Sequence, residues 1–425
     1  MAKIAKVIAR EVLESRGIPT IEVFCQLDNG AIAFSSVPSG TSTGTHEALE
    51  LRDHDNPRYK GQGVLKAIDN VNKVIAPAII GLDPSDQFGI DKKLNEMDGT
   101  PNKSQLGANA ILAVSTVVCK AGAIENSQNL YYWIFNLAQK FGLKNKLVIP
   151  TPLFNMINGG LHGAGNLDFQ EFHVIPASTK TYSEKLQLGS EVYMTIGENL
   201  AHRGAIHSVG DEGGYAPNLF TNADALEIFV DSIRQTSYQM GRDVFLGLDI
   251  AANTFYKDGL YTIRDKSSPL DDNQMLEYFK SLNEQYHLAI LEDPFYEDGW
   301  DSWKKARQVF GDTLTIVGDD LLVTNPVRLE KAIKENACNA ILVKPNQIGT
   351  VTETFSVIKM AADAGWKIIV SHRSGETNDS FIADFAVGVG ANYAKFGAPA
   401  RGERIAKYNR LSSIEADLIG FNSSK

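Results

Sequence analysis

Short apolar runs recur through the second part of this 425-residue chain, and their repetition leaves few folds open to it. From Leu147 onward, eight runs of this kind alternate with longer stretches whose apolar residues follow helical spacing. Eight strand–helix repeats within about 280 residues are typical of a (β/α)8 barrel. The segment 159–172 is a Gly-rich loop where a regular unit has a helix, so we expect an irregular start. The expected helices are 224–240, 273–286, 326–335, 351–364 and 380–389.

Charged residues end six of these runs, at intervals that match one strand–helix unit. After Glu292 the intervals are 27, 25, 28 and 23 residues. The strand ends of a barrel open onto one face, where barrel enzymes keep their active sites. A single strand-end carboxylate is equally well explained by a buried salt bridge, but six residues in register favour an active site. The six are Asp249, Glu292, Asp319, Lys344, His372 and Lys395.

The first part of the chain mixes strands and helices. Residues 20–26 alternate with period 2, and a turn at 28–30 connects them to a second expected strand, 31–37. Residues 63–75 show helical spacing, and 107–123 is apolar almost all round, which predicts a buried helix. The segment 136–146 precedes the change to repeated short apolar runs and is therefore the expected boundary between two domains. We therefore expect an α+β domain over 1–136 and the barrel over 145–425.

Composition and charge exclude several classes of function. Asp and Glu (51) outnumber Lys and Arg (41), so the net charge is −10, which disfavours nucleic acid and anionic membranes as partners. Cys25, Cys119 and Cys338 are too few and too scattered for a disulfide framework. Cations interrupt the N-terminal apolar run, and no apolar stretch near 20 residues is evident. We expect a cytoplasmic protein without a membrane span.

The strand-end residues also suggest a chemistry. Carboxylate oxygens suit a hard cation such as Mg²⁺ or Mn²⁺ rather than zinc. A nearby dication and a partly desolvated pocket would lower the pKa of a lysine on the next strand, which could then act as a base. A metal and an amine base together are equipped to remove a proton from a carbon next to a carboxylate.

Eight segments, in order along nearly the whole chain, resemble the enolase family. The resemblance implies an α/β protein with an N-terminal α+β domain and an irregular (β/α)8 TIM-like barrel that begins ββαα. It implies the reversible dehydration of 2-phospho-D-glycerate to phosphoenolpyruvate, a lyase reaction of glycolysis and gluconeogenesis, with two Mg²⁺ per active site. The segments are VPSGTSTGTHEALEL (37–51), NGGLHGAGNLDFQEF (158–172), GDEGGYAP (210–217), LEDPF (291–295), VGDDLLVTNP (317–326), KPNQIGT (344–350), SHRSGETNDSFI (371–382) and KFGAPARGER (395–404).

The resemblance also implies a role for each matching residue. Lys344 matches the base that removes the C2 proton, and Glu212 the acid that protonates the leaving hydroxyl, with Glu171 assisting. Lys395 matches the lysine that holds the substrate carboxylate. Asp249, Glu292 and Asp319 would be the ligands of the first Mg²⁺. Ser42 would bind the second Mg²⁺ together with the substrate phosphate. The pocket residues would be the histidines His162 and His372, the phosphate-binding Arg373 and Ser374, and Gln170.

The segment 39–45 around Ser42 is rich in Gly and Ser. With the resemblance, it fits a lid that closes over substrate and excludes water. Without the resemblance, an ordinary surface loop would be the simpler interpretation. His173 and four other histidines lack a recognisable constellation and receive no role.

This chain departs from the family pattern at three places, one of them Gly17-Ile18-Pro19 where Gly-Asn-Pro is usual. Asn253-Thr254 stands where Ser-Glu is usual, so a carboxylate beside the metal site is lost and we expect tuning rather than loss of the metal. Family dimers are tied by ion pairs, and Arg10 and Glu22 match the N-terminal partners. Ser413 and Ala416 replace the usual C-terminal Arg and Glu, although Glu415 or Asp417 could substitute. We still expect a homodimer or higher homo-oligomer.

Two other classes of function stay open at this point. The first is another carboxylate lyase of the superfamily, such as one acting on a sugar acid. The presence of Ser42, Arg373 and Ser374, which match the phosphate grip and the loop serine, argues against it. The second is a non-catalytic binding or structural protein on the enolase scaffold. The retention of every assigned catalytic position argues against that alternative.

Overall fold

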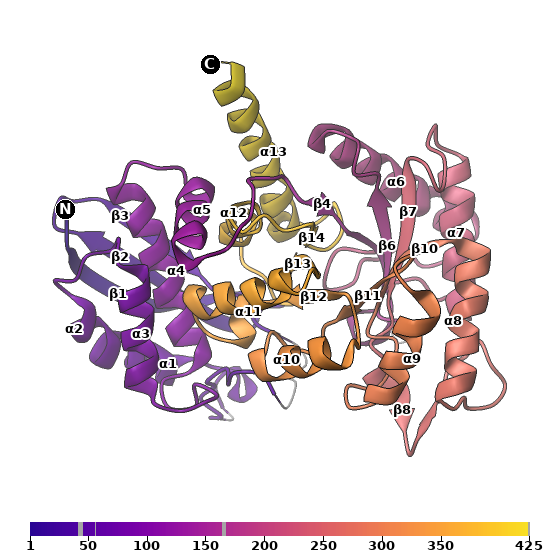
Figure 1. The fold of residues 1–425 in the computed structure, drawn as a ribbon, viewed down its shortest axis with the longest axis horizontal. Coiled ribbons are helices and arrows are strands. Elements are labelled where there is room, and N and C mark those ends of the chain that lie inside the picture. The colour runs from indigo at the N-terminus through magenta and orange to yellow at the C-terminus, as the bar shows by residue number, and fades with distance from the viewer. Residues whose placement is uncertain (41–45, 56, 164–166, 424–425) are drawn as a thin grey trace.

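The computed structural model describes residues 1–40, 46–55, 57–163 and 167–423, with an N-terminal α+β part beside a C-terminal barrel (Figure 1). The N-terminal sheet is antiparallel, in the order β1 (Ile4–Leu13), β2 (Pro19–Leu27), β3 (Ile32–Ser36). The β2–β3 hairpin was expected, whereas β1 was not. Its cations lie on the exposed face, while Val7 and Ala9 face the core. The alternation typical of a strand is therefore in the sequence, although the charged residues made it hard to recognise.

Helices cover the inner face of this sheet. The expected helix 63–75 is helical but divided, because a π-helical segment, η2 (Asn70–Ile75), separates α1 (Leu65–Asp69) from α2 (Ala76–Ile79). The remaining elements are η1 (Tyr59–Gly61), α3 (Gln87–Asp98), α4 (Ala108–Glu125) and α5 (Leu130–Phe141). The expected boundary segment 136–146 therefore begins within α5.

The buried helix expected at 107–123 is α4, which packs against β2 and β3. Among the described residues, α4 is the one helix long and apolar enough to cross a membrane by length and composition, but 83% of it is buried inside the protein. This corrects the expectation that no apolar stretch approaches membrane length. A mostly buried helix of this kind is what the core of a folded domain contains.

The second sheet closes into a barrel. Its order is β4-β14-β13-β12-β11-β10-β7-β6-β5, and only Leu153 separates β4 (Thr151–Pro152) from β5 (Phe154–Asn158). The two ends of the order thus belong to one interrupted strand, which pairs with β14 on one side and with β6 (Glu171–Pro176) on the other. The TIM-like barrel is confirmed.

The irregular start is confirmed as well. β6 pairs antiparallel with both β5 and β7 (Val244–Asp249), whereas the other barrel strands pair in parallel. Two helices, α6 (Tyr182–His202) and α7 (Asn222–Arg234), follow β6 before the chain reaches β7. The described part of the segment 159–172 holds only the short 3-10 helix η3 (Gly160–His162) before β6 begins.

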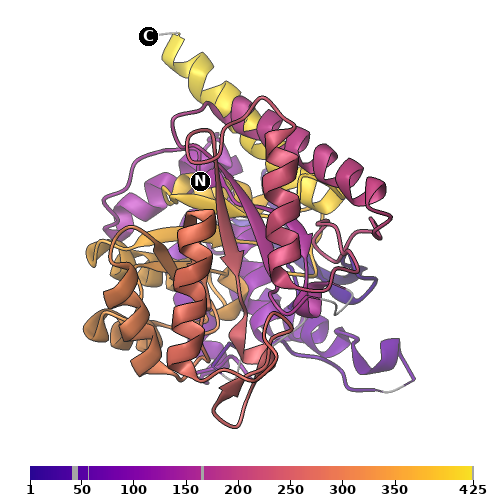
Figure 2. The ribbon, with the colours of Figure 1, turned by 90° about the vertical axis from the view of Figure 1, so that its right-hand side faces the viewer.

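Regular strand–helix units complete the barrel, with the helices packed outside the strands (Figures 1 and 2). The expected helices at 273–286, 326–335, 351–364 and 380–389 agree with the structure within one residue, while α7 ends six residues before the expected 240. The units are α8 (Asp272–Tyr286), β10 (Leu288–Glu292), α9 (Trp300–Phe310), β11 (Thr315–Gly318), α10 (Pro326–Glu335), β12 (Ala340–Val343), α11 (Val351–Asp363), β13 (Lys367–Ser371), α12 (Phe381–Gly388), β14 (Tyr393–Lys395) and α13 (Gly402–Ser423). Shorter elements are η4 (Ala252–Phe255), β8 (Tyr256–Lys257), β9 (Leu260–Tyr261) and η5 (Pro345–Gln347).

Candidate active site

The six strand-end residues lie at one end of the barrel. Asp249, Glu292 and Lys395 are the last residues of β7, β10 and β14. Asp319, Lys344 and His372 directly follow β11, β12 and β13. Because β6 runs in the opposite direction, its first residue, rather than its last, reaches the same end.

That first residue is Glu171, which pairs with Asp249 across the strands. A cleft of about 350 Å³ opens over this end. Asp249 and Glu292 are buried beneath it, 1% and 0% exposed. Ser42 lies outside the described residues. The other predicted residues all line the cleft, namely His162, Gln170, Glu171, Glu212, Asp319, Lys344, His372, Arg373, Ser374 and Lys395.

Lys395 connects three carboxylates at the floor of the cleft. Its Nζ lies 2.8 Å from Glu292 Oε1, 3.0 Å from Asp249 Oδ2 and 3.2 Å from Glu171 Oε1. Burial by itself lowers the pKa of this lysine, but the three carboxylates outweigh burial and hold the pKa well above its usual value. Lys395 is therefore a fixed positive charge, suited to holding an anion.

Lys344 sits at the wall of the cleft with its Nζ 2.5 Å from Asp319 Oδ2. Burial lowers the pKa of this lysine, yet the Asp319 carboxylate outweighs burial and raises it. The expected lowering of the Lys344 pKa is thus absent while Asp319 faces the amine alone. A cation on Asp319 would weaken that attraction and favour the neutral amine.

Glu212 lies in the loop between α6 and α7 and is held from several sides. Its Oε2 accepts from Asn155 Nδ2 at 3.0 Å and lies 3.4 Å from His372 Nε2, while Oε1 lies 3.4 Å from His162 Nδ1. Burial and the nearby Glu171 raise the pKa of Glu212, but the two histidines overcome both and leave it well below its usual value. The acid therefore rests in its ionised form.

Arg404 determines which nitrogen of His372 carries the proton. Arg404 Nη1 lies 2.7 Å from His372 Nδ1, and a guanidinium only donates, so Nδ1 accepts and Nε2–H points toward Glu212. Arg404 also donates to the backbone oxygens of Arg373 and Ser374. This buried arginine supports both the histidine and the predicted phosphate-binding pair, and no sequence pattern indicated it.

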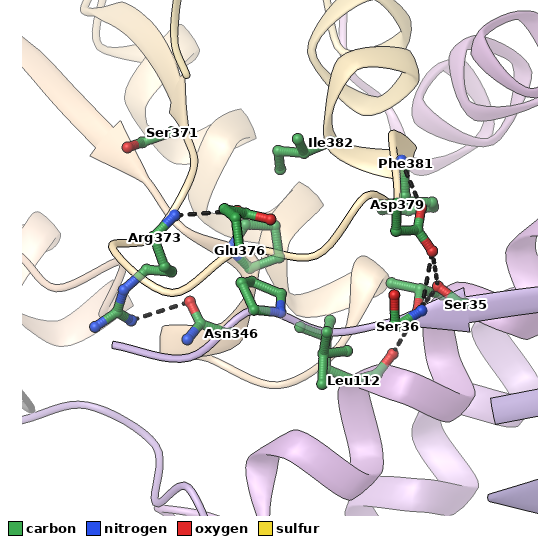
Figure 3. Close-up of a pocket in the computed structure, with 14 residues that line it drawn as sticks. Ser35, Ser36, Leu112, Asn346, Ser371, Arg373, Glu376, Asp379, Phe381 and Ile382 are labelled. Atoms are coloured by element: carbon green, nitrogen blue, oxygen red, sulfur yellow. Dashed lines mark hydrogen bonds between the residues drawn. The ribbon is translucent and has the colours of Figure 1, made fainter. Parts of the chain in front are cut away.

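Arg373 reaches the cleft from the connection between β13 and α12. Its Nη1 donates to Asn346 Oδ1 at 3.0 Å and lies 3.2 Å from Glu47 Oε2. Figure 3 shows Arg373 beside Asn346 at the edge of a second, smaller pocket of about 40 Å³, which also touches Ser35 and Ser36 of the N-terminal part. The guanidinium thus stands where the two parts of the chain meet.

The carboxylates at the barrel end fit a hard cation. Glu292 Oε2 and Asp319 Oδ1 are buried and have no hydrogen-bond partner within the described part of the chain, so each has a free lone pair. Two groups of carboxylate oxygens lie within 4.8 Å of one another, Asp249–Glu292–Asp293 and Asp293–Asp319–Asp320. Asp293 belongs to both groups although the sequence analysis did not select it. Its two oxygens already accept the backbone N–H groups of Asp319 and Asp320, so we assign it to positioning.

The substituted pair Asn253-Thr254 lies at the cleft. Asn253 Nδ2 donates to Asp320 Oδ2 at 3.0 Å and to Glu297 Oε2 at 3.3 Å, which bridges two carboxylates of the rim. Thr254 Oγ1 donates to the backbone oxygen of Ala251 at 2.9 Å. The expected loss of a carboxylate is real at Thr254, and neighbouring acids remain at the rim.

Sequence reasoning missed several supporting residues, namely Asn155, His173, Asp293, Asp320 and Arg404. His173 lies on β6 two positions after the predicted residue Glu171, so strand periodicity could have indicated it. Asn155 lies opposite His173 on β5, which carries no predicted site residue, so only the pairing of the two strands brings it to the site. Arg404 lies in α13, far along the chain from the residues it contacts, and only the fold brings it to the site.

Family comparison agrees with this geometry over nearly the whole chain. The family model described as the enolase N-terminal domain matches residues 4–134. The model described as the enolase C-terminal TIM barrel domain matches residues 146–423. The two matches cover both parts of the fold and the barrel end that carries the candidate site. The chain therefore belongs to the enolase family.

Proposed function

We propose that this protein, an enolase-superfamily lyase by its family, catalyses the reversible dehydration of 2-phospho-D-glycerate to phosphoenolpyruvate in glycolysis and gluconeogenesis. One observation carries the proposal. A single cleft is lined by three kinds of group. The amine is Lys344, the two acids are Glu171 and Glu212, and the two fixed cations are Lys395 and Arg373. Proton removal, leaving-group protonation and anion binding can therefore occur on one small substrate.

Each side chain has a task set by its contacts. Lys344, once released from Asp319, takes the proton from C2 of the substrate, and the electrons of that C–H bond form the C2–C3 double bond. The C3 hydroxyl then leaves as water with a proton from Glu212. Glu212 must be protonated for this step, and a bound anionic substrate raises its pKa in that direction. Lys395 holds the substrate carboxylate, while Arg373 and Ser374 bind the phosphate.

Divalent cations complete the proposal. Six carboxylates line the cleft against two fixed cations and the amine of Lys344, so a multiply anionic substrate needs added positive charge to enter. Asp249, Glu292 and Asp319 would hold one Mg²⁺, and Ser42 would help to hold the second. When bound, these ions stabilise the negative charge that develops on the substrate carboxylate.

The test follows phosphoenolpyruvate formation from 2-phosphoglycerate by ultraviolet absorbance, with Mg²⁺ and with chelator. We expect activity that depends on Mg²⁺ and falls by about 10²–10⁴-fold in Lys344→Ala, the range for loss of a general base. Lys359→Ala, on the exposed face of α11, is the matched control and should keep full activity. A folded, Mg²⁺-loaded wild type without any activity would overturn the proposal.

We also propose that the protein forms a homodimer through the exposed face of β1–β3, without the ion pairs usual in the family. Arg10 and Glu22 are cross-strand neighbours and bind each other, with Arg10 Nε 2.7 Å from Glu22 Oε1. Beside them, Ile8, Phe24 and Phe34 form an apolar row across the three strands, with Phe34 51% exposed. A mass of one chain at every concentration in light scattering would contradict this assembly.

The cellular setting is part of the same proposal. Cys25, Cys119 and Cys338 are all buried free thiols, which suits a reducing compartment. Burial raises the pKa of Cys25 to about 12, so this thiol is inert toward oxidation at neutral pH. We therefore propose that the reaction takes place in the cytoplasm.

A further inference from the structure

His173, to which the sequence analysis assigned no role, lies directly beneath the two acids Glu171 and Glu212. His173 is completely buried in β6, two residues after Glu171, and its Nε2 lies 2.9 Å from Glu171 Oε2. Alternate residues of a strand point to the same side, so Glu171 and His173 face the same side of the barrel sheet. The histidine therefore supports the acid from the buried side, away from the cleft.

The neighbouring strands are shaped around this ring. Gly247 of β7 is the direct cross-strand partner of His173, and a Cβ placed there would lie 3.1 Å from Ile175 Cδ1 and 3.5 Å from His173 Cβ. On the other side the partner is Asn155 of β5, which donates to Glu212. Two adjacent polar side chains thus each hold one of the two acids.

The direction of the hydrogen bond follows from the charge on Glu171. The ammonium group of Lys395 lies against Glu171 Oε1 and favours the ionised carboxylate. An ionised carboxylate only accepts, so His173 Nε2 must carry the proton. His173 Nδ1 is buried and has no hydrogen-bond partner within the described residues, in keeping with an imidazole protonated on Nε2 alone.

We propose that His173 is a positioning residue for the dehydration: its Nε2–H holds Glu171 Oε2 and leaves Oε1 directed at Lys395 and His162. Glu171 Oε1 lies 3.2 Å from Lys395 Nζ and 3.5 Å from His162 Nδ1. Without the donor the carboxylate would be free to rotate away from these partners. The proposal rests on the proposed function only for its catalytic consequence, because the contact itself can be measured separately.

The kinetic test compares His173→Leu with His173→Gln. Leucine fills a similar volume without a donor, whereas glutamine retains an N–H donor. We expect His173→Leu to lose about 10–100-fold in kcat, the usual effect of removing a supporting hydrogen bond, with KM nearly unchanged, and His173→Gln to recover most of that loss. His202→Leu, an exposed histidine at the end of α6, is the control. A purely packing role predicts that the apolar leucine is the better replacement, and that result would overturn the proposal.

A second measurement does not depend on turnover. Histidine ¹⁵N spectra of the wild type should show His173 protonated on Nε2 and bare on Nδ1, and the Nε2–H signal should shift in Glu171→Ala but not in Asp363→Asn. The opposite tautomer, or an Nε2–H signal that does not shift in Glu171→Ala, would overturn the positioning role. This measurement stands even if His173→Leu does not fold. The expected spectrum in an inactive wild type would overturn the proposed function and the catalytic consequence together, while the Glu171 contact would stand.

Discussion

At the scale of single residues, Asp293 shows how one buried side chain organises a neighbouring strand end. It follows Glu292 in a left-handed backbone conformation, with φ of 43°. Its Oδ1 accepts from the backbone N–H of Asp319 at 3.0 Å and its Oδ2 from that of Asp320 at 2.7 Å. The position of the predicted ligand Asp319 therefore depends on a residue of the adjacent strand.

Asp293→Ala should weaken both the fold and metal binding. It leaves one buried and one part-buried N–H donor without acceptors, at about 1–3 kcal/mol each, so we expect a loss of about 2–6 kcal/mol in the free energy of unfolding. Mg²⁺ affinity should fall by about 10–100-fold, as for other residues that orient metal ligands. Asp293→Asn keeps one acceptor and tolerates positive φ, so its effects should be smaller. Urea unfolding in chelator and calorimetric Mg²⁺ titration would measure the two effects; unchanged affinity in the alanine variant would contradict the assignment.

At the scale of elements, α13 and α6 are connected through Glu415. The first N–H groups of a helix have no partner within the helix. Glu415 Oε1 accepts from Tyr182 N at 2.6 Å, and Oε2 accepts from Ser183 N and Oγ at 3.1 and 2.9 Å, at the start of α6. Glu415 is thus engaged within its own chain, which argues against its use as a substitute partner between subunits.

Glu415→Ala should destabilise the protein by about 1–2 kcal/mol, since it removes a charged acceptor at a helix N-terminus. Asp417→Ala, two residues further along α13, is exposed and should change stability by less than about 0.5 kcal/mol. Urea unfolding at low ionic strength would compare the two variants. Equal losses would show that Glu415 contributes no more than an ordinary surface charge.

At the scale of the whole molecule, Asp379 ties the N-terminal part to the barrel. It lies between β13 and α12 and accepts from Lys120 Nζ of α4 at 2.7 Å, from Ser36 N of β3 at 2.9 Å and from Phe381 N at 2.8 Å (Figure 3 shows the contacts to Ser36 and Phe381). Separate hydrophobic clusters on either side support our proposal that 1–136 and 145–425 are two domains, although the inner face of α5 packs with the barrel cluster.

Stability at this junction should depend on pH. Burial raises the pKa of Asp379, but Lys120 and the backbone donors outweigh burial and lower it. A depressed folded-state pKa stabilises the protein above the unfolded value of about 3.9, and this contribution is lost as pH falls through the folded value. Asp379→Asn should therefore lose about 1.5–3 kcal/mol at pH 7, the range for hydrogen bonds to a charged group, with a smaller difference at pH 3. Asp363→Asn is the exposed control, and urea unfolding at both pH values is the measurement; a difference that does not change with pH would contradict the assignment.

The sequence by itself determined the fold class, most barrel elements and the strand-end residues, because strand alternation, helical spacing and the interval between units are local properties of the chain. The same local signals failed at β1, whose exposed cations obscured its alternation. They predicted α4 correctly as a buried helix, but not that this helix approaches the length of a membrane span. The resemblance supplied residues such as Glu212, in a loop, and His162, at the end of the short 3-10 helix η3, where the sequence has no periodicity.

Only the tertiary structure decided which side chains support the site. The antiparallel direction of β6 brings its first residue, Glu171, to the catalytic end and places His173 beneath it. Arg404 and Asp293 act through hydrogen bonds to residues that are distant in the sequence or on another strand. Such contacts depend on strand direction, register and side-chain orientation, which arise when the barrel closes and which no local pattern in the sequence encodes.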